Sequence, residues 1–186
     1  MIKEILEAQK AFDLECWEKK NGGERPTGAQ IITAFFAEVG ELVQELKPEW
    51  CYWKNTKKTV DMEKVLEELA DCLHFAASIA WQGIEERRES YEDHSEAIEL
   101  VLSIDSLVAK KVGSSSKKYD DGTARSIEAL ILTTCNALKA EEESSKAAIM
   151  ATLFYFGAAI GFEHKQLADA YWKKLAVNKE RLAGDY

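Results

Sequence analysis

The chain has 186 residues, 46% of them hydrophobic, which is enough for one domain with a sizeable core. It carries 24 Lys and Arg residues against 33 Asp and Glu residues, and the resulting net charge of -9 argues against broad electrostatic binding to nucleic acid or to anionic membranes. The N-terminal stretch MIKEILEAQKAF lacks the apolar core of a signal peptide, and the four cysteines lack CxxC spacing. We therefore expect a cytoplasmic protein whose cysteines are small buried side chains in a reducing compartment (Cys16, Cys51, Cys72 and Cys135).

Apolar residues recur at helical spacing along nearly the whole chain, and no alternating β-branched run indicates a strand. A first helix is expected at 2–19, and NGGERP ends it. Thr27 and Gln30 form a T-x-x-Q capping box, so we predict that a second helix begins there and runs to about residue 46. The following KPEWCYWKNTKKT is predicted as a loop, after which Asp61 caps a long helix at about 62–90.

The second half of the chain continues the helical pattern. We expect helices at about 93–112, 124–141, 145–161 and 164–182, with GSSSKKYDDG (113–122) as a flexible loop. The uncharged segment 147–162 is shorter than the roughly 20 residues that a membrane-spanning helix needs, so we expect it to be buried in the core or at a subunit interface. The pattern predicts a single all-α, bundle-like domain over 1–186.

Two pairs of carboxylates lie among the apolar positions of two predicted helices. At about 100° per residue, Glu38 and Glu41 share a broad stripe with apolar residues of the second helix, and Glu68 and Asp71 do so in the 62–90 helix. Helices joined by a modest loop tend to pack antiparallel, which would bring the four carboxylates together. Half-buried carboxylates lose their charge unless a cation compensates, and Mg²⁺ takes oxygen ligands while keeping waters for a phosphate-bearing substrate. The pattern therefore favours a magnesium site.

Two other interpretations of these carboxylates remain open. E-x-x-E spacing recurs elsewhere in this acidic chain, and carboxylates at the edge of a stripe can pair with lysines such as Lys64. A ferritin-like di-iron site needs Glu-x-x-His in each of two helices, whereas this chain has one Asp71-x-x-His74 and no second copy. His74 lies off the carboxylate stripe, so we expect it to be structural.

The C-terminal helix carries a polar face. Tyr171, Lys174, Asn178 and Arg181 fall on one side of it; Lys and Arg suit phosphate oxygens, and Asn can pair with a base edge. The alternative is a solvated helix whose cations complement its dipole.

Aromatic residues and an amide form the other candidates. Trp50, Tyr52 and Trp53 can stack on a nucleobase or anchor their loop to the core, and the neighbouring Lys54 can reach a phosphate. Gln9 lies on the apolar stripe of the first helix, where an amide can read a base edge or be satisfied within the core.

Together these pieces resemble a known family. FFAEVGELVQE followed by VLEELADCLHF resembles the E-x-x-E … E-x-x-D signature of the all-α NTP pyrophosphatases, the superfamily of MazG and the dimeric dUTPases. WCYWK (50–54) resembles the F-K-x-W-K loop of the dimeric dUTPases of Gram-positive bacteria, their phages and trypanosomatids, although Cys51 stands where that loop often has Lys. AYWKKLAVNKERLAGDY resembles the Y-x-x-K-x-x-x-N-x-x-R … G-Y ending of the same branch. The resemblance covers about residues 5–84 and 166–186.

The resemblance implies a helical homodimer that hydrolyses dUTP, and also dUDP, in the cytoplasm of a bacterium or of the host cell of a phage. Two or more Mg²⁺ ions would be held by the catalytic carboxylates Glu38, Glu41, Glu68 and Asp71. The residues implied to bind substrate are Trp50, Trp53 and Phe75 at the base, Gln9 and Asn178 at the nucleoside, and Lys54, Lys174 and Arg181 at the phosphates. The alternatives are a sister pyrophosphatase acting on dCTP or a broad range of nucleotides, and a non-catalytic helical dimer that binds a regulator. A regulatory protein partner is also compatible with catalysis.

Overall fold

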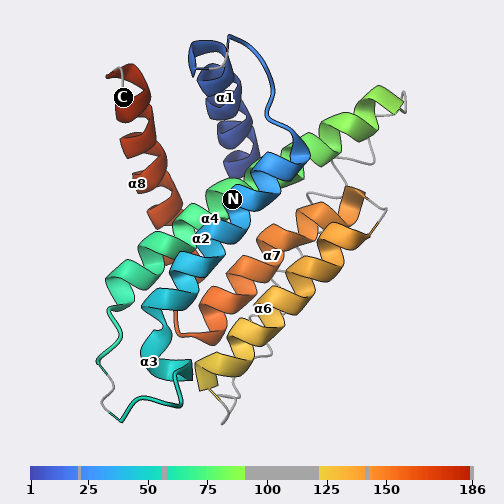
Figure 1. Cartoon of the computed structure of the whole chain (residues 1–186). Helices are drawn as coiled ribbons and strands as arrows, with labels where there is room; N and C mark the ends of the chain where they lie inside the picture. Colours follow the sequence, from blue (N-terminus) through green and yellow to red (C-terminus); the bar gives the residue numbers. More distant parts are fainter. Residues whose placement is uncertain (21, 56–57, 91–121, 141–142, 185–186) are drawn as a thin grey trace.

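The computed structural model describes residues 1–20, 22–55, 58–90, 122–140 and 143–184 (Figure 1). All regular elements in these ranges are helices, which confirms the predicted all-α class. The described helices are α1 (Ile2–Lys20), α2 (Gly28–Glu45), α3 (Lys47–Trp50), α4 (Met62–Ser90), α6 (Gly122–Lys139), α7 (Glu143–Ala159) and α8 (His164–Ala183). The helix predicted at about 93–112 and nearly all of the loop predicted at 113–122 lie outside the described residues.

The predicted caps of α2 and α4 are confirmed. The Gln30 backbone N–H donates to Thr27 Oγ1 at 3.3 Å, and the Thr27 N–H donates to Gln30 Oε1 at 2.8 Å, which completes the capping box. At the start of α4, Asp61 Oδ1 accepts from the N–H of Glu63 at 3.1 Å. Local hydrogen bonds therefore set where the two carboxylate-bearing helices begin.

The segment predicted as a loop after α2 contains one helical turn. Pro48 stands at the first turn of α3, where a missing N–H is tolerated. The Cys51 N–H donates to the Lys47 carbonyl O at 3.0 Å and closes the turn. The loop prediction was wrong for these four residues, because Pro is favoured in the first turn of a helix and Pro48 stands there.

Helix α4 is the centre of the fold and packs against α1, α2, α7 and α8. Figure 1 shows α2 lying along α4, with α6 and α7 on one side of this pair and α1 and α8 on the other. Neighbours on several sides explain why Leu69, Leu73 and Ala76 of α4 are fully buried.

The uncharged segment 147–162 forms most of α7 and lies in the core. Ile149, Met150 and Phe154 have no exposed surface. Gly157 permits close approach to α4, since a Cβ there would lie 3.2 Å from Leu69 Cδ2. Among the described helices none is by itself long and apolar enough to cross a membrane; one pair passes that test jointly, and it is bent by 118° between α7 and α8.

Candidate active site

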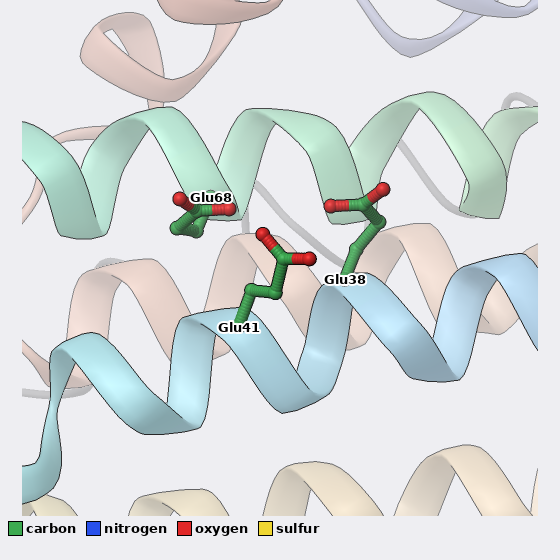
Figure 2. Close-up of side chains that lie close together, drawn as sticks. All are labelled: Glu38, Glu41 and Glu68. Atoms are coloured by element: carbon green, nitrogen blue, oxygen red, sulfur yellow. The ribbon is translucent and has the colours of Figure 1, made fainter.

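Three of the four predicted carboxylates converge between α2 and α4. Figure 2 shows Glu38 and Glu41 rising from α2 toward the α4 face that carries Glu68. One carboxylate oxygen of each lies within 4.8 Å of one oxygen of each of the others. Glu38 and Glu41 are almost one helical turn apart on α2, so both project into the same narrow space. The predicted meeting of the two helices is thereby confirmed for these three residues.

The electrostatics of this cluster favour a cation. Glu38 and Glu68 are half-buried and Glu41 is exposed. Burial raises the pKa of Glu38 and of Glu68, and the neighbouring carboxylates, Asp71 among them, raise both pKa values further. Hard oxygen ligands from two helices, crowded enough to disfavour one another's ionisation, fit Mg²⁺.

The fourth predicted carboxylate, Asp71, lies beside the cluster and not within it. Its Oδ2 accepts a hydrogen bond from Lys174 Nζ of α8 at 2.6 Å. Burial raises the pKa of Asp71, while Lys174 and then Arg181 act to lower it. Among the described residues, Lys174 of the C-terminal helix pairs with one of the four predicted carboxylates. The neighbouring Lys64, which the sequence offered as an alternative partner, does not take this place.

A groove of about 620 Å³ runs between α4 and α8 next to this ion pair. Lys173, Lys174 and Arg181 line its α8 side, and Glu63 and Glu67 line its α4 side. Two of the predicted phosphate-binding residues, Lys174 and Arg181, therefore face one groove beside Asp71. Asn178 is half-buried on the same helix and is not among the lining residues.

The aromatic loop is partly anchored and partly exposed. Trp50 Nε1 donates to the Val43 carbonyl O at 2.7 Å, so this ring is tied to the end of α2. Trp53 is 57% exposed and lies edge-on to both Trp50 and Tyr52. Lys54 is exposed. The loop thus offers an open aromatic surface built on one fixed tryptophan, whereas Phe75 packs half-buried against the core.

Gln9 is buried, whereas direct contact with a nucleobase requires an amide that the base can reach. It is 3% exposed, and its amide contacts His74 of α4, Tyr171 of α8 and Asp13 of α1. His74 is buried and stacks on Tyr171 with ring centroids 4.3 Å apart, in agreement with a structural role. Burial lowers the pKa of His74 to about 4, so the imidazole is neutral at pH 7.

Sequence reasoning missed the rest of this polar cluster. Asp13 accepts from Ser78 Oγ at 2.6 Å and from Trp81 Nε1 at 2.7 Å, and none of these three residues was singled out. The one available signal was that Asp13 follows Gln9 by four residues, which places a carboxylate next to an amide on the apolar stripe of α1.

A family model described as dUTPase matches residues 1–186, the full length of this chain. Among curated proteins, none matches the sequence.

Proposed function

This chain belongs to the dUTPase family and is a dUTP diphosphatase, and we propose that it releases pyrophosphate from dUTP with Mg²⁺ held by Glu38, Glu41, Glu68 and Asp71. The observation that carries the metal assignment is the convergence of Glu38, Glu41 and Glu68 within 4.8 Å from two helices. Asp71 is adjacent to them, and its charge contributes to the raised pKa of both Glu38 and Glu68. We propose that two or more ions bind, since three clustered carboxylates and a fourth beside them provide more oxygens than one Mg²⁺ uses in proteins.

In the proposed reaction, water attacks the α-phosphorus, the bond to the β-phosphate bridging oxygen breaks, and dUMP and pyrophosphate leave. Bound Mg²⁺ would neutralise the triphosphate and lower the pKa of water. A carboxylate of the cluster takes the proton of the attacking water.

Lys174 and Arg181 are proposed to hold the phosphates. An ammonium group has three donors, so Lys174 can keep its hydrogen bond to Asp71 while donating to a phosphate oxygen. Arg181, which lines the same groove, is proposed to stabilise charge on the departing pyrophosphate. Lys54 on the aromatic loop is proposed as a further phosphate contact.

The remaining predicted contacts concern the nucleoside. We propose that Trp53 and Trp50 close on the base from the loop and that Phe75 stacks against it. Gln9 and Asn178 are proposed to contact the nucleoside, and Gln9 is buried, so nucleotide binding must replace part of what now covers it. Hydrolysis of dUDP and assembly into a homodimer are also proposed, on the resemblance of the sequence motifs.

Pyrophosphate release from dUTP, dCTP, dTTP, UTP and ATP, with Mg²⁺ and with EDTA, tests this function. We expect release from dUTP that EDTA abolishes. Equal or greater release from dCTP or from ATP would keep the metal chemistry and reject the uracil assignment. Release that persists in EDTA would reject the metal assignment.

A further inference from the structure

A cluster of six polar side chains joins α1, α4 and α8, and we call it the polar junction. Its members are Gln9, Asp13, His74, Ser78, Trp81 and Tyr171. All of them are at most 9% exposed. It lies one helical turn from the active site on two elements, because His74 follows Asp71 by three residues on α4 and Tyr171 precedes Lys174 by three residues on α8.

Asp13 accepts hydrogen bonds on both of its carboxylate oxygens. Oδ2 accepts from Ser78 Oγ at 2.6 Å and from Trp81 Nε1 at 2.7 Å. Oδ1 accepts from Gln9 Nε2 at 2.8 Å. Burial raises the pKa of Asp13 while these three donors lower it, so the hydrogen bonds offset part of the cost of a buried charge.

The carboxylate of Asp13 determines which way the amide of Gln9 points. An ionised carboxylate has no proton to donate, so Gln9 must turn its NH₂ group to Asp13 and its carbonyl oxygen away. Gln9 Oε1 consequently faces α4 and α8, where His74 Nδ1 lies at 2.7 Å and the Tyr171 hydroxyl at 3.1 Å. Gln9 therefore presents an acceptor on the side of the junction nearest the active site.

That acceptor has capacity for another donor. The Tyr171 hydroxyl has one proton and two acceptors in reach, Gln9 Oε1 and the Ile5 carbonyl O at 3.2 Å. When Tyr171 donates to Ile5, one lone pair of Gln9 Oε1 is available, while His74 occupies the other. A donor on a bound ligand can thus replace Tyr171 at Gln9 without leaving a buried hydroxyl proton unpaired.

We propose that Asp13 is a positioning residue that sets base selectivity by fixing the amide of Gln9 with its oxygen toward the nucleoside. This inference rests on the proposed function, in which Gln9 contacts the nucleoside. Uracil carries a donor at N3–H, which an amide oxygen accepts, whereas N3 of cytosine carries a lone pair that the same oxygen repels. Thymine also has N3–H, so Asp13 contributes to the choice between dUTP and dCTP and not to the choice between dUTP and dTTP.

The replacement Asp13→Asn tests this inference because it is nearly isosteric. The asparagine oxygen can take the place of Oδ2 and keep the donors Ser78 and Trp81, which puts the asparagine NH₂ group against Gln9. Gln9 must then turn its oxygen to Asn and its NH₂ group toward the active site. We expect the dUTP to dCTP ratio of kcat/KM to fall at least about tenfold, and the dUTP to dTTP ratio to stay within about threefold of the wild-type value.

A control and a rescue separate orientation from simple destabilisation. Ser78→Ala removes a donor to Asp13 but leaves Gln9 held, so it should lower the melting temperature and leave both ratios unchanged. In the double variant Gln9→Glu with Asp13→Asn, the asparagine NH₂ donates to one glutamate oxygen and the other accepts from His74 and Tyr171. This variant should fold and recover the preference for dUTP over dCTP, and it carries the test if Asp13→Asn alone does not fold.

The outcomes distinguish the inference from the proposed function. A wild-type enzyme that prefers dUTP to dCTP, with an Asp13→Asn variant that keeps the full preference, overturns the inference alone. So does a double variant that fails to fold or folds without the dUTP preference, and so does a Ser78→Ala variant that loses as much selectivity as Asp13→Asn. A wild-type protein that does not hydrolyse dUTP overturns the proposed function and the inference with it.

Discussion

Replacing Glu68 by Gln is expected to abolish activity and at the same time to stabilise the protein in the absence of metal. The variant removes one of three carboxylates whose oxygens lie within 4.8 Å of one another. At that separation two unit charges repel by about 0.9 kcal/mol in bulk water and by about 3.5 kcal/mol at an effective dielectric constant of ~20. Because Glu41 is exposed and Glu68 only half-buried, the aqueous value applies, and we expect a gain of about 1 kcal/mol in the free energy of unfolding.

Thermal unfolding in EDTA and in Mg²⁺ measures this effect. In EDTA, about 1 kcal/mol corresponds to a rise in Tm of about 2–4 °C for a chain of this size. Mg²⁺ should raise the Tm of the wild type, because it binds the folded site, and should raise the Tm of Glu68→Gln much less. Pyrophosphate release from dUTP should be lost. Glu128→Gln, which removes an exposed carboxylate of α6, is the control and should change neither Tm nor activity.

Whether Glu68→Gln is more or less stable than the wild type in EDTA tests the proposed repulsion between the carboxylates. Burial, and after it the neighbouring carboxylates, raise the pKa values of Glu38 and Glu68 above their ordinary ones. Their ionised forms therefore oppose folding at neutral pH, and this cost is relieved as the pH falls through the raised values. A Glu68→Gln variant less stable than the wild type in EDTA would show that the cluster is held by favourable contacts and not strained by like charge. Equal stabilisation of both proteins by Mg²⁺ would place the metal elsewhere.

Three further predictions concern separate parts of the molecule. His74 has a pKa of about 4 in the folded protein against about 6.5 when unfolded, so protonation of the unfolded state should lower the free energy of unfolding by up to about 3 kcal/mol as the pH falls from 6.5 to 4. In urea unfolding, the stability advantage of the wild type over His74→Asn should shrink across that range. Arg181→Ala should remove about 2 kcal/mol of transition-state stabilisation, measured as a lower kcat/KM for dUTP, and replacing the exposed Lys179 by Ala is the control. An unchanged kcat/KM in Arg181→Ala would show that Arg181 takes no part in catalysis. Gly157→Val should destabilise the protein by about 2 kcal/mol, measured by urea unfolding, because even a Cβ there would lie 3.2 Å from Leu69 Cδ2. An unchanged stability would mean that the Leu69 side chain can move aside for the larger residue.

The helices could be predicted from local sequence patterns because they are formed by interactions between residues close in the sequence. Thr27 and Gln30 are three residues apart and form their capping box within one turn, so the start of α2 was readable from four letters. The apolar spacing of α2 and α4 also placed Glu38, Glu41 and Glu68 on faces that meet, since a helix fixes the angle between its own side chains. Hence the all-α class and most of the carboxylate cluster followed from the sequence.

Tertiary structure decided which side chains from distant segments meet. Lys174 pairs with Asp71 across 103 residues; helical periodicity placed Lys174 on the polar face of α8 but could not show which carboxylate that face meets. Gln9 had two open interpretations, and only the packing of α1 against α4 and α8 surrounds its amide with Asp13, His74 and Tyr171. Helical periodicity gives the direction in which a side chain leaves the axis of its own helix. It does not give the position of one helix along another. For that reason the carboxylate-bearing faces of α2 and α4 could be predicted from the sequence, whereas the contacts within the polar junction could not.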